Sequence, residues 1–179
     1  MKTDLLTSCR FIALWALVLC LTIVSCEAKR ADKAYLHGDY AKAAEELQFL
    51  AEQGEARAQY DLGLLYDTGR GVPQSNEAAL QWYQRAAEQG EPRAQYNLGL
   101  MYANGQGVPQ DYARAYFWIT LSAAQENEHA IEAKAFLNEK MTPELMARAN
   151  EFIHEYEKSR SLLDTPCQLC PMVKGTTAH

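Results

Sequence analysis

Two arginines and two tyrosines recur at one fixed spacing along the chain. Arg57 and Tyr60 return 36 residues later as Arg93 and Tyr96. A guanidinium group binds a carboxylate through two parallel hydrogen bonds, and a tyrosine ring adds amphipathic contact area beside it. If the fold places both pairs on one face, they form a ladder that can grip a carboxylate or the C-terminus of a polypeptide. The alternative is that the arginines pair with neighbouring glutamates and the tyrosines belong to the core.

No other pattern of reactive side chains indicates catalysis, a metal ion or a cofactor. Gly69 and Gly71 follow an expected helix, whereas a phosphate-binding glycine loop follows a strand. Neither S-x-x-K nor H-E-x-x-H occurs in the sequence. We interpret its histidines as surface residues because they lack a ligand spacing: His37, His129, His154 and His179. We therefore expect no catalytic residue, no metal site and no small-molecule cofactor.

The charge balance argues against nucleic acid as a partner. The net charge is −6, and the lysines and arginines are scattered along the sequence. Phosphate neutralisation requires a basic stripe, which the sequence does not contain.

The first 25 residues are typical of an export signal. Lys2 and Arg10 form a basic segment before an apolar run over 11–24, which is shorter than the ~20 residues of a membrane-spanning helix. The segment at 23–26, Ile-Val-Ser-Cys, resembles a bacterial lipobox, which implies cleavage before Cys26 and a diacylglycerol on its sulfur. Glu27 in place of aspartate implies sorting to the outer membrane of a Gram-negative host. A cleaved secretory signal with an incidental Cys26, or a signal anchor, is the alternative.

Two cysteines near the C-terminus form a C-x-x-C pair, Cys167 and Cys170. An exported compartment is oxidising, so a disulfide between them is possible, as are two inert thiols. A single pair without nearby histidines is a weak zinc signal, and a redox site requires a strand and helix around it. We therefore expect a structural or inert role for this pair.

A tandem repeat with a period of 36 residues occupies the middle of the sequence. Residues 54–89 and 90–125 are identical at 19 of 36 aligned positions. A period of this size is typical of stacked helical or β repeats that present a binding surface. Residues 31–54 also end in Ala-Glu-Gln-Gly, so they are expected to form the second half of an earlier copy after a short helix.

Each full copy is expected to form two helices. The first helices span about 55–68 and 92–104, and apolar residues recur in them every three or four positions. Ser75 and Asp111 are suited to cap the second helices. After residue 127 the period fades, and we expect a helix over 129–140 and a further helix that begins at Thr142-Pro143.

Two glycines and two tryptophans indicate how the paired helices pack. Gly63 and Gly99 fall inside the first helices, where glycine costs about 1 kcal/mol relative to alanine. We therefore expect the second helix to approach so closely at these positions that a side chain would block it. Trp82 and Trp118, on the second helices, are expected in the core facing the first helices rather than as ligand-stacking residues.

These repeats resemble the Sel-one-like repeat, a longer-looped relative of the tetratricopeptide repeat. Residues 58–90 and 94–124 carry the resemblance, and both begin A-x-Y-x-L-G-x-x-Y-x-x-G-x-G-V. The resemblance implies an all-α fold, a right-handed α-solenoid of helical hairpins with a C-terminal capping helix. The expected division is a lipoprotein signal peptide at 1–25, a repeat domain at 26–160 and a disordered tail at 161–179. The repeat domain is expected to contain a half repeat at 31–54, repeats at 54–89 and 90–125, and capping helices at 129–160.

The resemblance also implies a partner-binding face. In the tetratricopeptide arrangement the first helix of each hairpin lines the concave side. The residues expected there are Arg57, Tyr60, Asp61, Leu64, Asp67, Arg93, Tyr96, Asn97, Leu100 and Ala103.

Family resemblance implies a function in binding rather than in catalysis. Members mostly scaffold complexes or bind peptides and cell-envelope partners. We expect a lipid-anchored, non-enzymatic adaptor facing the periplasm, or a soluble periplasmic or secreted protein if Cys26 is not lipidated. One alternative is an enzyme acting on β-lactam or peptidoglycan substrates, like cysteine-rich members of the family, although these repeats contain no cysteine. The other is a structural subunit of a secretion or export assembly.

Overall fold

The computed structural model describes residues 30–163. Residues 30–36 are helical, and seven further helices follow in this range. Their bounds are α2 Tyr40–Glu52, α3 Ala56–Thr68, α4 Asn76–Glu88, α5 Pro92–Asn104, α6 Tyr112–Ala123, α7 Glu128–Asn138 and α8 Pro143–Leu163. The part of the protein described contains no strand. The expected signal peptide, Cys26, Cys167 and Cys170 lie outside the described residues.

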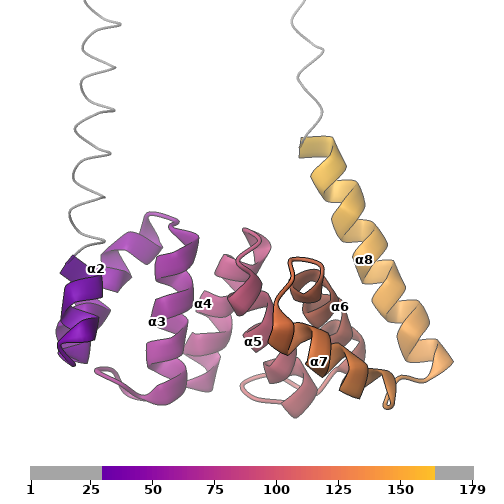
Figure 1. Ribbon diagram of the computed structural model, residues 1–179, viewed down its shortest axis with the longest axis horizontal. Helices are drawn as coiled ribbons and strands as arrows, with labels where there is room; N and C mark the ends of the chain where they lie inside the picture. The colour runs from indigo at the N-terminus through magenta and orange to yellow at the C-terminus, as the bar shows by residue number, and fades with distance from the viewer. Residues whose placement is uncertain (1–29, 164–179) are drawn as a thin grey trace, which may run out of the picture.

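The helices form antiparallel hairpins that stack side by side (Figure 1). α3 packs against α4 and α5 against α6, while α2 contacts α3 and α4 contacts α5. This arrangement confirms the expected solenoid of helical hairpins. Within residues 30–163, no helix is both long enough and apolar enough to cross a membrane.

Caps and turns form where the sequence indicated them. The Ser75 side chain accepts a hydrogen bond from the Ala78 amide, and the Asp111 side chain accepts from the amides of Ala113 and Arg114. These oxygens satisfy amide groups that have no partner inside the helix. The second helix of each copy therefore begins at a fixed point after its glycine-rich turn.

The glycines inside α3 and α5 allow the close approach that was expected. A Cβ atom on Gly63 would lie 2.7 Å from Tyr83 Cδ1 on α4. A Cβ atom on Gly99 would lie 2.5 Å from Ile119 Cγ1 on α6. Such distances are far below van der Waals contact, so any larger residue would have to separate the two helices.

Tyr83 and Ile119 occupy the core positions that were expected for the tryptophans. Both are fully buried, whereas Trp82 and Trp118 are half-buried. The Trp82 ring lies under the Arg85 guanidinium group, at 4.6 Å from ring centroid to Cζ. Each tryptophan nevertheless packs against an apolar cluster, Trp82 against one that includes residues of α3 and Trp118 against one that includes residues of α5. The expectation that they belong to the core therefore holds only in part, since they are partly rather than fully buried.

Buried glutamines join successive hairpins with the period of the repeat. Gln59 Nε2 donates to the carbonyl oxygen of Ala51 at 3.0 Å, and Gln89 Nε2 donates to Gln59 Oε1 at 2.7 Å. The same two hydrogen bonds recur at Gln95 and Gln125, at 3.1 and 2.8 Å. A buried polar group without a partner costs about 1–3 kcal/mol. The bonds to Ala51 and Ala87 therefore favour one register between neighbouring hairpins, and the other two join the helices of one hairpin.

The C-terminal helices depart from the hairpin geometry. α7 and α8 both pack on α6, and they diverge from each other (Figure 1). Phe117 of α6 contacts Phe152 and Tyr156 of α8, with ring centroids 6.1 and 5.7 Å apart. α8 continues to Leu163, so the expected start of the tail at residue 161 was too early.

Candidate functional site

Two adjacent hollows lie along α3 and α5, and together we call them the groove. The first hollow has a volume of about 470 Å³, and the second has a volume of about 550 Å³. The hollows share Tyr60, Leu64 and Arg93, so they form one continuous surface. The first is completed by Ala31, Asp32, Tyr35, Leu36, Leu47, Arg57 and Asp61. The second is completed by Pro92, Tyr96, Asn97, Gln125, Asn127 and His129.

The first hollow combines an apolar lining with mutually paired charges. Tyr35, Leu36 and Leu47 contribute apolar surface. Arg57 lies 3.7 Å from a carboxylate oxygen of Asp32 and 3.7 Å from one of Asp61. The Arg57 side chain is 62% exposed, so each of these ion pairs contributes little to stability.

The second hollow is built around Arg93. Its Nε donates to Glu91 Oε1 at 2.8 Å, and its guanidinium Cζ lies 4.5 Å from the centroid of the Tyr60 ring. Among the described residues, no second hydrogen bond of this guanidinium group is found. The stacking on Tyr60 fixes the plane of the group and leaves terminal N–H donors for a ligand.

Burial and charge compete at Asp61, between the two arginines. Burial raises the pKa of the Asp61 carboxyl, while the charges of Arg93 and Arg57 oppose this rise. Burial alone would lower the pKa of Arg93, but the hydrogen bond to Glu91 and the electrostatic effects of Glu91, Tyr60 and Asp61 together outweigh it and raise the pKa. Arg93 therefore keeps its charge at any physiological pH, and the charge at Asp61 is the less secure of the two.

Most of the residues predicted on the concave face line the groove. The structure brings together Arg57, Tyr60, Asp61, Leu64, Arg93, Tyr96 and Asn97. Their role in binding stays a prediction.

Three predicted residues lie elsewhere. Asp67 is outside both hollows and accepts a 3.4 Å hydrogen bond from the Tyr83 hydroxyl. Leu100 and Ala103 line a separate hollow of about 120 Å³, together with residues of α6 and α7. The α7 residues that line this hollow with Leu100 and Ala103 are Ala133, Phe136 and Leu137.

Sequence reasoning missed His129. It lies 36 residues after Arg93, at the position of Arg57 and Arg93 in the next copy. Its ring faces Tyr96, with centroids 6.0 Å apart, much as Arg93 stacks on Tyr60. The spacing was available as a signal, but the fading of the repeat after residue 127 concealed it.

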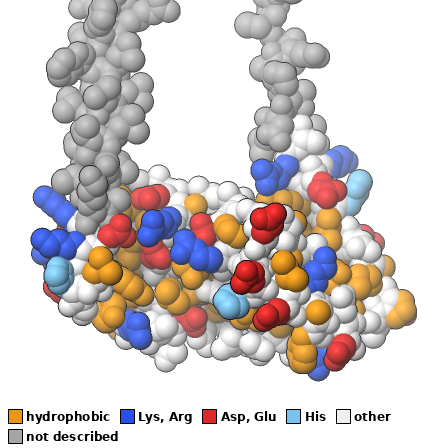
Figure 2. Space-filling model, in the orientation of Figure 1, with side chains coloured by type: hydrophobic (Ala, Val, Ile, Leu, Met, Phe, Trp, Pro, Cys, Tyr) orange, Lys and Arg blue, Asp and Glu red, His pale blue; other side chains and the backbone are white. Residues whose placement is uncertain are grey.

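The charge distribution on this side of the molecule is mixed. Figure 2 shows basic and acidic side chains interspersed with hydrophobic ones on the face that it presents. Within residues 30–163, no group of three or more His, Cys, Asp or Glu side chains is placed to hold a metal ion. The groove thus offers guanidinium, aromatic, amide and apolar groups for non-covalent binding.

The fold and the groove define a helical-repeat protein, an α-solenoid with a groove along its first helices. The Sel1 repeat family model matches residues 56–91 and 92–127, which are the two copies seen in the structure. A Sel1 repeat protein from Oxalobacter formigenes has a crystal structure similar to this one, with 39% sequence identity and a TM-score of 0.57. That similarity covers 63% of this chain and 87% of the other. The protein belongs to the Sel1-repeat family.

A second crystal structure extends the similarity over more of the sequence. It is that of c5321, a protective antigen present in uropathogenic Escherichia coli strains that displays an SLR fold, with 27% identity and a TM-score of 0.70. The similarity covers 80% of this chain but spans only 33% of that protein. A search of curated proteins found no match. Sel1 repeats typically mediate protein–protein interaction, and proteins that contain them are typically non-catalytic scaffolds.

Proposed function

We propose that this protein is a non-enzymatic scaffold that binds a segment of a partner protein in the groove. The observation that carries the proposal is the continuity of the two hollows through Tyr60, Leu64 and Arg93. An extended peptide laid across α3 and α5 would place apolar side chains in the first hollow and polar groups near Arg93. Burial of the apolar side chains would supply most of the affinity, and the guanidinium group would supply orientation.

The proposed setting is the cell envelope, with a lipid on Cys26 holding the scaffold at the periplasmic face of the outer membrane. This part is supported by the lipobox-like segment at 23–26 and by the absence of aspartate at position 27. Two full repeats make a short groove, so affinity for one segment would be modest. Restriction to a membrane surface raises the local concentration of a partner on the same surface and compensates for this.

The groove is tested by the double variant Arg57→Ala/Arg93→Ala. After crosslinking in the native host, we expect loss of the partner identified by mass spectrometry, with unchanged helical content. The matched control is Arg70→Ala/Arg85→Ala, which removes two arginines that stack on aromatic rings outside the groove. Equal recovery of the partner with both double variants would contradict the groove as the binding site.

The lipid anchor is tested separately by Cys26→Ser. We expect the variant to move from the membrane fraction to the soluble fraction, because acyl chains supply the proposed attachment. Retention in the membrane fraction would exclude lipid on Cys26 as the anchor.

Hydrolysis of nitrocefin by the purified protein would contradict the non-enzymatic part of the proposal.

A further inference from the structure

The cationic positions of the groove continue into a third copy. Positions 57, 93 and 129 are spaced by one repeat and hold Arg57, Arg93 and His129. Arg93 and His129 each face the tyrosine of the preceding copy, Tyr60 at 4.5 Å and Tyr96 at 6.0 Å. Arginine and tyrosine side chains therefore alternate along the groove, and the imidazole of His129 follows the second tyrosine.

The two hollows differ in charge. Asp32 and Asp61 line the first hollow, and both form ion pairs with Arg57. Their negative charges therefore disfavour an anion in this hollow. Among the residues described, no acidic side chain lines the second hollow, which contains Arg93 and His129. Three amide side chains, Asn97, Gln125 and Asn127, complete its polar wall.

We propose that the second hollow binds a carboxylate of the partner segment between Arg93 and His129, while an adjacent apolar side chain fills the first hollow. This inference rests on the proposed function and adds the chemistry and the direction of the bound segment. The carboxylate can come from an acidic side chain or from the C-terminus of the partner. Since histidine gains its charge between about pH 8 and pH 5, binding tightens as the pH falls.

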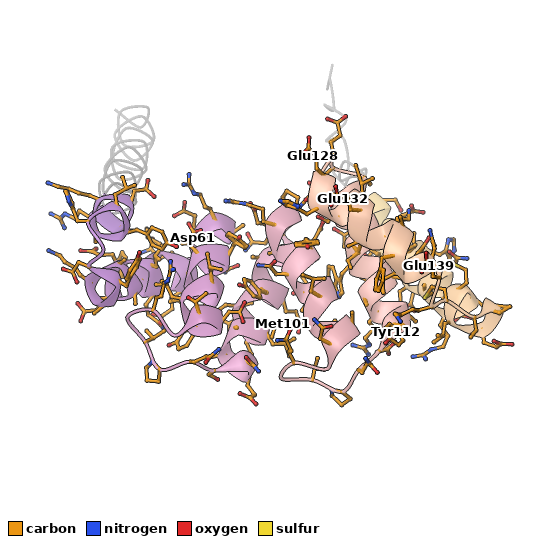
Figure 3. The ribbon with its side chains drawn as sticks, turned by 60° about the horizontal axis from the view of Figure 1, so that its bottom comes forward. Asp61, Met101, Tyr112, Glu128, Glu132 and Glu139 are labelled. Atoms are coloured by element: carbon orange, nitrogen blue, oxygen red, sulfur yellow. The ribbon has the colours of Figure 1, made fainter. Side chains whose placement is uncertain are left out.

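Other charged groups around His129 bear on this pH dependence. Arg93 and Tyr96 face it from α5, and Tyr60 of α3 lines the same hollow. Glu91 accepts a hydrogen bond from Arg93, and Asp61 lines the first hollow together with Arg93. Glu128 and Glu132 lie on α7 itself (Figure 3). These two carboxylates lie one residue before and three residues after His129 on the same helix, so their charges act against an anion bound there and reduce the gain from the imidazole.

Three acetylated tetrapeptides test the proposal on the full-length protein. The first is Leu-Leu-Asn-Asn with a free C-terminal carboxylate, the second is Leu-Leu-Asp-Asp with an amidated C-terminus, and the third is Leu-Leu-Asn-Asn amide, which is neutral. Affinity is measured by NMR titration, following the imidazole protons of His129 and the ring protons of Tyr60 and Tyr96. The variants are His129→Gln and, as a matched control, His154→Gln, which alters an exposed histidine of α8.

At about pH 5.5 we expect at least one of the two carboxylate peptides to bind the wild type about three- to ten-fold more tightly than the neutral peptide. We expect the affinity for that peptide to fall about two- to five-fold at about pH 8. His129→Gln should lose at least half of this pH-dependent change, and His154→Gln should lose none. The free-terminus and side-chain arms identify which source of carboxylate the hollow prefers.

Equal binding of all three peptides would overturn the inference while leaving the groove as a peptide site. Full retention of the pH dependence in His129→Gln would also overturn it. Absence of binding by every peptide, up to about 10 mM, would overturn it and would count against the proposed function as well.

Discussion

Replacing Gly99 with alanine tests the packing at the centre of the solenoid. The new methyl group would lie 2.5 Å from Ile119 Cγ1 and 3.2 Å from the Ala115 carbonyl oxygen. Ile119 is fully buried, so it cannot turn into solvent. Overpacking of this kind costs about 1–3 kcal/mol, while alanine gains about 1 kcal/mol over glycine in a helix. We expect Gly99→Ala to lower the free energy of unfolding by about 1 kcal/mol, the difference between these opposing effects.

Urea unfolding followed by far-UV circular dichroism measures this difference. Ala147→Gly, at an exposed position of α8, gives the helix-propensity effect in this protein without a change of core packing. Ile119→Ala alone should cost about 2–5 kcal/mol. The double variant Gly99→Ala/Ile119→Ala should cost less than the sum by about 1–2 kcal/mol, because the added methyl group then enters the space that Ile119 leaves.

One result would refute this reasoning. If Gly99→Ala stabilised the protein by the full helix-propensity gain of about 1 kcal/mol, the methyl group would meet no resistance. Glycine at this position would then not be required by the approach of α6.

Two further predictions concern buried polar groups. Gln95→Ala should cost about 1–3 kcal/mol, because it removes two hydrogen bonds of a buried side chain, each worth about 0.5–1.5 kcal/mol. Urea unfolding checks this, and a loss no larger than that of the exposed substitution Gln106→Ala would contradict it. Burial raises the pKa of Asp61 above 3.8 despite the opposing charges of Arg93 and Arg57. The folded state therefore holds the Asp61 proton more tightly than the unfolded state does. The stability that this provides is lost as the pH rises through the raised pKa. Asp61→Asn should therefore be more stable relative to wild type at about pH 7 than at about pH 3, and parallel stability curves of the two proteins over this range would show that Asp61 does not contribute.

Local features predicted most of the helices. Ser75 and Asp111 cap α4 and α6 as expected, because a cap depends on a side chain and amides only two or three residues away. Gly63 and Gly99 also indicated a close helix pair correctly, since a costly residue repeated at one position signals a packing constraint.

The candidate site was less predictable because it depends on several copies at once. Arg57 and Arg93 were expected to act alike, yet Arg57 is paired with aspartates and Arg93 stacks on Tyr60. Their surroundings differ because the helical residues 30–36, with Asp32, lie beside Arg57, whereas α3, with Tyr60, lies beside Arg93. His129 escaped notice because its neighbours no longer resemble the repeat, although its position follows the same period.

The sequence by itself determined the helices and their caps, since these depend on contacts between residues close together along the backbone. It also determined the period and the family, which follow from the repeated residues themselves. Tertiary structure decided which face of each helix is buried. Neighbouring residues on a helix point about 100° apart, so the crossing geometry of α3 and α4 selects Tyr83 rather than Trp82 for the core. Tertiary structure also decided the two hollows and the difference in charge between them, because a hollow exists only where separate helices meet.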